Sequence, residues 1–374
     1  MKKTLITLTL AITCLAYGLL IGKYEVFPYN LIKSAQDYFE EQPIELITQQ
    51  NEISYEDISP ESLISVHPKN SDSLRSVLSS ILFGSSSLPN SLPDTIFSVK
   101  DNEYADLIGL QKIDQFEIVM EHNIKSIGYI FHPIKSNNRL AIYHQGHRGD
   151  FLNGKNTIRH FIDKGYTVYA LCMPLSGKNN QPMIDDKKLG KYKLTTHGRL
   201  KFFKNPMKYF ISPIITMINH AESKNFDDIC MIGVSGGGWS TTLAAAVDTR
   251  IKNSFPVAGT YPMYVRFKKN PNTDFGDFEQ SYGELFSQIN YMEMYILGAI
   301  GEQRKQIQVL NKYDPCCFSG NDFKSYQKVI SQKVESFEDG FFNVLPDTTH
   351  SDHKISEFAL SKIDQVLNSN TSKK

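Results

Sequence analysis

Apolar and polar positions follow a regular alternation from residue 116 onward. Two apolar runs, 116–120 and 126–131, flank the polar residues Glu121, His122 and Asn123, which predicts a β-hairpin. Short apolar runs of strand length then alternate with longer segments of helical periodicity. The predicted strands are 140–143, 166–171, 229–232, 254–257, 307–310 and 341–345, and the predicted helices are 156–164, 205–222, 239–247 and 355–367.

A hairpin followed by alternating strands and helices is typical of a mostly parallel sheet with helices on both faces. The pattern therefore predicts one α/β domain over 115–370. Two ranges interrupt it, 174–204 and 259–303, and both follow predicted strands. Because an open α/β sheet binds ligands beyond the carboxyl ends of its strands, we expect lid or substrate-recognition elements in these two ranges.

The N-terminal part of the chain has a different pattern. Lys2 and Lys3 precede an apolar run over 5–22 that carries no charge. A run of about 18 residues is at the lower limit for spanning a bilayer, and the Lys pair favours a signal anchor with the main domain outside the cytoplasm. A cleaved signal peptide, giving a secreted or periplasmic protein, is the alternative, although the small-residue motif at 16–18 falls inside the apolar run. The polar, Ser-rich range 23–114 is expected to be a linker and a helical extension.

The amino-acid composition limits the classes of function that can be expected for this chain. The chain has 374 residues, of which 41% are apolar, enough for a sizeable core. With 40 Lys and Arg against 40 Asp and Glu, no net field attracts nucleic acid, so a nucleic-acid partner is not expected. The cysteines do not have zinc or disulfide-framework spacing, and they are expected to be small buried residues; a bridge between some of them in an oxidising compartment stays open. They are Cys14, Cys172, Cys230, Cys316 and Cys317.

One motif points to chemistry. Gly233-Val234-Ser235-Gly236-Gly237 stands between a predicted apolar strand and a predicted helix. This strand-turn-helix context is what a nucleophile elbow requires, because glycines leave room for a sharp turn that exposes the serine hydroxyl. The start of the following helix also favours developing negative charge. The motif predicts that Ser235 is a catalytic nucleophile.

The elbow, the preceding hairpin and the residues downstream resemble the α/β-hydrolase superfamily over roughly 116–367. The resemblance implies a triad in the order Ser, acid, His, with the acid after the second strand beyond the elbow. Asp314 holds that position, following the strand 307–310. The resemblance places the base between the last strand and the closing helix, where His350 and His353 are candidates. His353 is favoured because it directly precedes the helix; Asp347 and Asp352 are weaker candidates for the acid.

The resemblance also implies an oxyanion hole with two backbone donors. One is the N–H of Gly236, the residue after the nucleophile. The other comes from the loop after the third strand, here His144-Gln145-Gly146-His147-Arg148-Gly149. Gly146 matches the family glycine and His147 becomes the second donor. Gln145 stands where the family usually has His, which is a departure from the family motif.

These features predict a serine hydrolase that cleaves a small-molecule or lipid-like carboxylic ester through an acyl-enzyme. Amide and thioester substrates remain open, and no cofactor or metal is expected. One alternative is a binding protein that kept the fold and lost catalysis. Another is a metal-dependent hydrolase using the His-x-x-His pairs His144/His147 and His350/His353, although no His-Glu-x-x-His motif is present.

For two further side chains, a structural role is favoured over a functional one. His197 lies in the first interrupting range, where a solvated loop histidine is favoured over one that contacts substrate. Trp239, the only tryptophan, is expected to pack the helix that follows the elbow rather than to bind ligand.

Overall fold

The computed structural model describes residues 59–186, 190–269 and 276–368, together with Thr13 and Tyr17. Apart from those two residues, the predicted membrane anchor at 5–22 lies outside the described residues, as does 23–58. The chain divides into two compact units, 1–54 and 55–374, and the fold below is that of the second. Within the described residues, no helix combines the length and the apolar character needed to cross a membrane.

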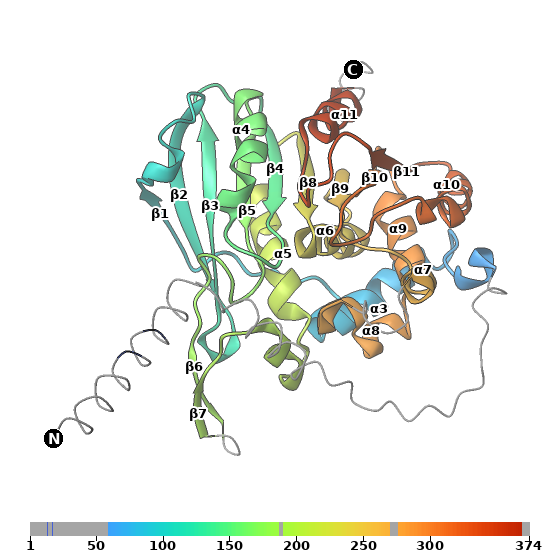
Figure 1. Ribbon diagram of the computed structural model, residues 1–374, viewed down its shortest axis with the longest axis horizontal. Coiled ribbons are helices and arrows are strands. Elements are labelled where there is room, and N and C mark those ends of the chain that lie inside the picture. The colour runs from blue at the N-terminus through green and yellow to red at the C-terminus, as the bar shows by residue number, and fades with distance from the viewer. Residues whose placement is uncertain (1–12, 14–16, 18–58, 187–189, 270–275, 369–374) are drawn as a thin grey trace. The chain divides into compact units, whose positions relative to one another are not determined.

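A nine-stranded sheet forms the centre of this unit (Figure 1). Its spatial order is β1-β2-β3-β5-β4-β8-β9-β10-β11. The strands are β1 Thr95–Val99, β2 Leu110–Val119, β3 Lys125–Pro133, β4 Arg139–His144, β5 Thr167–Leu171, β8 Asp228–Val234, β9 Asn253–Val257, β10 Lys305–Asn311 and β11 Phe341–Asp347.

The predicted hairpin and the predicted parallel region are both confirmed. β2 and β3 pair in antiparallel fashion around a turn at Glu121–Asn123, with Phe116 opposite Gly128. From β5 to β11 neighbouring strands are parallel, so the carboxyl ends of β4, β8, β10 and β11 meet at one edge of the sheet. This edge is where the candidate site is assembled.

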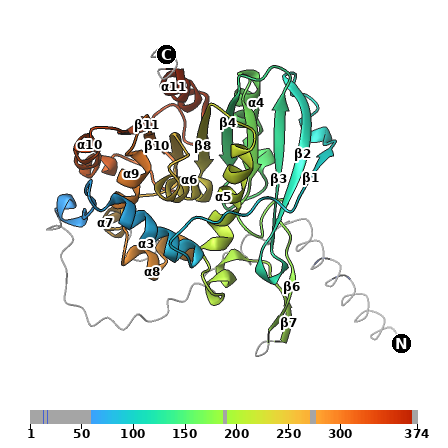
Figure 2. The same cartoon turned by 180° about the vertical axis from the view of Figure 1, so that it is seen from behind.

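Helices cover both faces of the sheet, as predicted. Along β8, Ile229 and Met231 belong to the core on one face, and Cys230 and Ile232 to the core on the other. This period of two buries every position from Ile229 to Val234, which explains why this part of the strand is a continuous apolar run in the sequence. The views from front and behind show the two helix layers (Figures 1 and 2).

The helices divide unequally between the faces. α4 and α11 pack on one face, and α3, α5, α6, α9 and α10 on the other. The α-helices are α3 Ser71–Phe83, α4 Lys155–Asp163, α5 Lys208–Glu222, α6 Gly236–Val247, α7 Met263–Lys269, α8 Gly283–Phe286, α9 Tyr291–Ala299, α10 Gln327–Glu335 and α11 Glu357–Asn368. Every residue of α6 is buried, which matches its run of small side chains.

The sheet domain begins earlier than the sequence predicted. β1 and the first half of β2 lie within 23–114, the range expected to hold only a linker and helices. The predicted helical part is represented by α3, whose Leu78, Ile81 and Leu82 are buried against the core. Arg75 on this helix donates a hydrogen bond to the carbonyl of Leu297 at 2.8 Å. The segment from α3 onward is therefore an integral part of the domain.

The two interrupting ranges differ in character. The first carries a separate two-stranded sheet, β6 Met183–Asp186 with β7 Gly190–Lys193, and the short helix η6 His197–Phe202. The second carries α7, the short helix η7 Phe278–Ser281, α8 and α9. α9 is buried throughout and packs on α6, so the end of this range is core structure and not a lid.

Candidate functional site

Ser235 occupies a strained turn between β8 and α6. Its backbone has φ 57° and ψ −126°, a combination that costs a non-glycine residue about 1–3 kcal/mol. Two hydrogen bonds hold the turn: the Ser235 N–H donates to the carbonyl of Val257, and the Trp239 N–H donates to the carbonyl of Ser235, each at 2.9 Å. The strain is therefore maintained by the sheet and the helix together.

The loop after β4 presses closely against this turn. A Cβ atom on Gly237 would lie 2.0 Å from the carbonyl oxygen of His144, and one on Gly146 would lie 2.7 Å from the Cβ of Ser235. The same atom on Gly146 would lie 3.4 Å from the nitrogen of Gly236. Glycine is thus required where the two loops meet, and the residues predicted to form the oxyanion hole are brought to one place.

Asp314 and His353 form a close pair at the ends of β10 and β11. The Nδ1 of His353 lies 2.5 Å from Oδ2 of Asp314, whose side chain is fully buried. Burial raises the pKa of Asp314, but the hydrogen bonds from His353 and from the backbone N–H of Cys316 outweigh it and lower that pKa below its usual value. Asp314 therefore stays ionised beside the imidazole.

The other nitrogen of His353 is left free. Among the residues that the structure describes, its Nε2 is buried and has no hydrogen-bond partner. The side-chain amide of Asn311, at the end of β10, donates to the carbonyl of Lys354 at 2.9 Å and so fixes the backbone next to His353. The imidazole is therefore held on one side by Asp314, and its second nitrogen makes no hydrogen bond to the described residues.

His350 differs from His353 in its hydrogen bonding. Its Nε2 lies 3.2 Å from Oδ2 of Asp347, and its Nδ1 accepts a hydrogen bond from the backbone N–H of Asp352 at 3.0 Å. The buried Asp347 also accepts hydrogen bonds from the side chains of Thr349 and Ser356. Both His350 nitrogens are therefore engaged within the loop that carries His353.

A pocket of about 700 Å³ lies over these residues. Of the residues predicted to act in catalysis, Ser235, His147 and His353 line it, whereas Asp314 and Gly236 are not among its lining residues. The remaining lining comes from several loops: Tyr143, Gln145, Gly146, Arg148, Asn153, Gly154, Asn156, Thr157, Val234, Asp277, Cys316, Cys317, Lys354 and Ile355. One cavity thus holds a strained serine, a carboxylate-bound histidine and the predicted oxyanion loop.

Neither His-x-x-His pair gathers its two rings into a metal site in the described part of the chain. His144 is buried, its Nδ1 lies 2.8 Å from the carbonyl of Gln145, and burial lowers its pKa to about 4. His147 turns the other way, and its Nε2 lies 2.7 Å from Oε1 of Glu279.

The expectation that His197 is a solvated loop residue is wrong. Its side chain is only 16% exposed, and its Nε2 lies 3.5 Å from Oδ1 of Asp277. Asp277 and Glu279 were not singled out in the sequence, because the fold alone brings them from the second interrupting range to the loop after β4. The sequence does contain the two histidines and the two acidic residues. Because they are far apart along the chain, it does not indicate that they meet.

The cysteines fall into two groups. Cys172 and Cys230 are free and buried, as expected. Burial was wrongly expected for the other two, because Cys316 is exposed and Cys317 is half-buried; they form a disulfide with each other, which the sequence had left open, and both line the pocket. Cys14 lies outside the described residues. Trp239 is fully buried in α6 with its ring edge-on to Phe210, which confirms its packing role.

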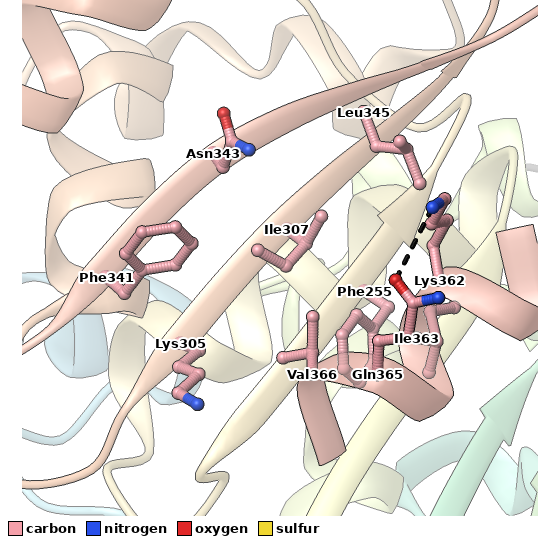
Figure 3. A pocket seen from close by; sticks show the side chains of 10 residues that line it. All are labelled: Phe255, Lys305, Ile307, Phe341, Asn343, Leu345, Lys362, Ile363, Gln365 and Val366. Carbon is pink, nitrogen blue, oxygen red and sulfur yellow. Dashed lines mark hydrogen bonds between the residues drawn. The ribbon is translucent and has the colours of Figure 1, made fainter. Parts of the chain in front are cut away.

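A second hollow, of about 440 Å³, lies between α11 and the strands β9 to β11. Figure 3 shows the mainly apolar side chains that line it, among them Phe255, Ile307 and Val366, with Lys362 donating to Gln365 at 3.4 Å. Its lining contains no serine, cysteine, histidine or carboxylate. The chemical groups are therefore at the pocket over Ser235.

Comparison with known proteins supports the fold. No protein-family model and no curated protein matches the chain by sequence. Among solved structures, an acetyl xylan esterase from Paenibacillus sp. R4 is similar at a TM-score of 0.51 and 14% identity, covering 83% of this chain and 98% of its own. The methylesterase BT1017 is similar at a TM-score of 0.53 and 16% identity, covering 82% of this chain and 65% of its own. The chain has the α/β-hydrolase fold that the sequence predicted.

Proposed function

We propose that this chain is a serine hydrolase that cleaves carboxylic esters through an acyl-enzyme on Ser235. One observation carries the proposal. The Nε2 of His353 is unpartnered among the described residues, its Nδ1 is held by the buried Asp314, and it lines the same pocket as the strained Ser235. A nucleophile, a base and an orienting acid are the set that acyl transfer requires.

In the proposed reaction, His353 Nε2 takes the proton of the Ser235 hydroxyl as Oγ attacks the carbonyl carbon of the ester. Asp314 orients the imidazole and stabilises its cation. The tetrahedral oxyanion is bound by the backbone N–H groups of Gly236 and His147. Collapse expels the alcohol, which takes the proton from His353, and water then releases the acid by the same steps in reverse.

The pocket favours a small ester with polar groups. Arg148, Asn153 and Asn156 line it and offer hydrogen-bond donors to a substrate. The two structural neighbours are named as esterases, which supports an ester over an amide or a thioester. The apolar hollow under α11 is lined by none of the proposed catalytic residues.

We further propose that residues 5–22 anchor the protein in a membrane, with the catalytic domain outside the cytoplasm. The uncharged apolar run and the Lys2-Lys3 pair before it support this.

Covalent labelling tests the catalytic proposal. A fluorophosphonate probe should modify the wild-type chain at Ser235, and Ser235→Ala should lose labelling and lower short-chain ester hydrolysis by about 10³-fold or more. The matched control is Ser351→Ala, which removes an exposed serine from the His353 loop and should label normally. Labelling that persists in Ser235→Ala would assign the nucleophile elsewhere. A folded wild-type chain that is never labelled and hydrolyses no ester would favour a non-catalytic binding protein.

A further inference from the structure

Four side chains from three separate loops meet beside the pocket. They are His147 from the loop after β4, His197 at the start of η6, and Asp277 and Glu279 at η7. One ligating atom of each, an imidazole Nε2 or a carboxylate oxygen, lies within 4.8 Å of all the others. We propose that these four residues bind a divalent transition-metal ion, with Zn²⁺ the best match.

The spacing of the four atoms suits tetrahedral coordination. Zinc bonds of 2.0–2.2 Å to nitrogen and oxygen give ligand-to-ligand edges of about 3.3–3.5 Å. His147 Nε2 lies 2.7 Å from Glu279 Oε1 and 3.1 Å from Asp277 Oδ2. His197 Nε2 lies 3.5 Å from Asp277 Oδ1 and 4.0 Å from Glu279 Oε1. These separations bracket the tetrahedral edge, so small side-chain adjustments would close the site on an ion.

Glu279 provides independent support. It is fully buried, one carboxylate oxygen faces His147, and the other has no hydrogen-bond partner among the described residues. A buried carboxylate with an unsatisfied oxygen is costly unless a further positive group compensates it. The buried Arg266 supplies a positive charge near Asp277. A metal ion would satisfy both carboxylates at once.

The donor set indicates which metal is preferred. Two imidazoles and two carboxylates match zinc, whereas calcium and magnesium prefer sites made of oxygen alone. Both histidines present Nε2, and their rings lie 5.1 Å apart. Phe210 packs edge-on against His197 and also against Phe278, so an apolar wall bounds one side. Four protein ligands leave no open position, which is typical of a structural and not a catalytic zinc.

The position of the site suggests what the ion would do. The ring of His147 lies directly over the start of α6, since a Cβ atom on Gly236 would be 2.5 Å from its Cε1. An ion bound here would link both interrupting ranges to the loop that carries the proposed oxyanion donor. It would stabilise that loop without taking part in the reaction. The inference stands without the proposed function, because metal binding and labelling of Ser235 are measured separately.

Metal binding to the purified full-length chain tests this directly. After treatment with a chelator, equilibrium dialysis against Zn²⁺ should return about one ion per chain, as expected for a structural site. His197→Gln and Glu279→Gln should each reduce the bound zinc at least tenfold. The matched control is His160→Gln, which alters a histidine paired with Asp364 on the opposite face of the sheet and should bind zinc like the wild type.

Two further measurements keep the test decisive if a variant folds poorly. Zinc should raise the unfolding temperature of the wild type and of His160→Gln, but not that of His197→Gln. Cobalt bound to the wild type should give the intense visible absorption of a tetrahedral ion. The proposal is overturned if the wild type binds no zinc at micromolar free concentration, if His197→Gln binds as much, or if bound cobalt has an octahedral spectrum. Labelling of Ser235 in zinc-free protein would still report on the hydrolase proposal.

Discussion

Gly146 and Ser235 approach so closely that a Cβ atom on the glycine would lie 2.7 Å from the Cβ of the serine. It would also lie 2.7 Å from the carbonyl oxygen of Val234, so no flexible side chain could give way. The nucleophile turn and the loop after β4 therefore have a single relative position. If the backbone of His147 stabilises the oxyanion, this contact sets the distance between donor and nucleophile.

The first prediction follows from this contact. Gly146→Ala should move the two loops apart and lower kcat for ester hydrolysis by about 10²-fold, because small displacements of catalytic groups are costly. KM should change less, since Arg148 and the asparagines of the pocket remain. Steady-state kinetics on a short-chain ester checks it. Gly283→Ala is the control, since a Cβ atom there meets nothing within 4 Å, and it should keep wild-type kinetics. Unchanged kcat in Gly146→Ala would remove His147 from the proposed oxyanion hole.

The sequence predicted the central strands well because burial there is complete. Strands such as β8 are buried on both faces and appear as plain apolar runs bounded by polar residues. β1 was missed for the opposite reason. It is an edge strand with four of its five residues exposed, so its sequence carries no alternation to detect. α3 did carry a signal, since Leu78, Ile81 and Leu82 recur at helical spacing.

Residues that the fold brings together could be predicted from the sequence only where a local motif, or the order of the residues along the chain, indicated them. Asp314 and His353 are 39 residues apart in sequence and still form a close hydrogen-bonded pair in the site. The cluster of His147, His197, Asp277 and Glu279 has no such order. Its members come from separate loops, which meet only because the two interrupting ranges pack together. The hydrophobic periodicity of a single segment does not predict how such loops pack.

The second prediction concerns location. If residues 5–22 form an uncleaved anchor, the protein should pellet with membranes and resist extraction by alkaline carbonate, because the apolar segment holds it in the bilayer. Deleting residues 1–22 should move the protein to the soluble fraction while Ser235 remains labelled. An N-terminus mapped beyond residue 22 in the mature protein would instead establish cleavage and release.

The third prediction concerns the pH dependence of stability. Burial raises the pKa of Asp347, but hydrogen bonds from Ser356 and Thr349 outweigh it and hold the pKa below the usual 3.8. A carboxylate with a lowered folded-state pKa contributes stability at pH above 3.8, and that contribution is lost as the pH falls through the folded-state value. Asp347→Asn should therefore lower the free energy of unfolding by about 2 kcal/mol at pH 7.

Chemical denaturation at several pH values measures this. The difference between wild type and Asp347→Asn should shrink as the pH falls below 3.8. Asp352→Asn, which alters an exposed residue paired only with Lys354 in this loop, should leave the unfolding midpoint at pH 7 unchanged. A difference for Asp347→Asn that stays constant across the acid range would show that the ionised carboxylate is not what stabilises the loop.

The last prediction assigns the base. His353 and His350 are three residues apart, and both lie beside a buried carboxylate, so position in the chain does not distinguish them. The hydrogen bonding of the second ring nitrogen does distinguish the two histidines. His350 Nδ1 accepts the Asp352 N–H, whereas His353 Nε2 has no partner among the described residues, and the residue His353 lines the same pocket as Ser235. A general base needs one nitrogen free to take the proton of the nucleophile and one bound nitrogen that fixes its tautomer, and among the described residues His353 has one of each.

His353→Ala should therefore lower kcat for ester hydrolysis about as much as Ser235→Ala, by about 10³-fold or more. Asp314→Asn should cause a loss of about 10⁴-fold, because an amide favours the wrong imidazole tautomer. His350→Ala should retain most of the activity and lose mainly stability, since it removes one partner of Asp347. Measuring kcat together with the unfolding temperature separates the two effects. If His350→Ala were inactive at an unchanged unfolding temperature while His353→Ala remained active, the base would be His350, and Asp347 would become the acid.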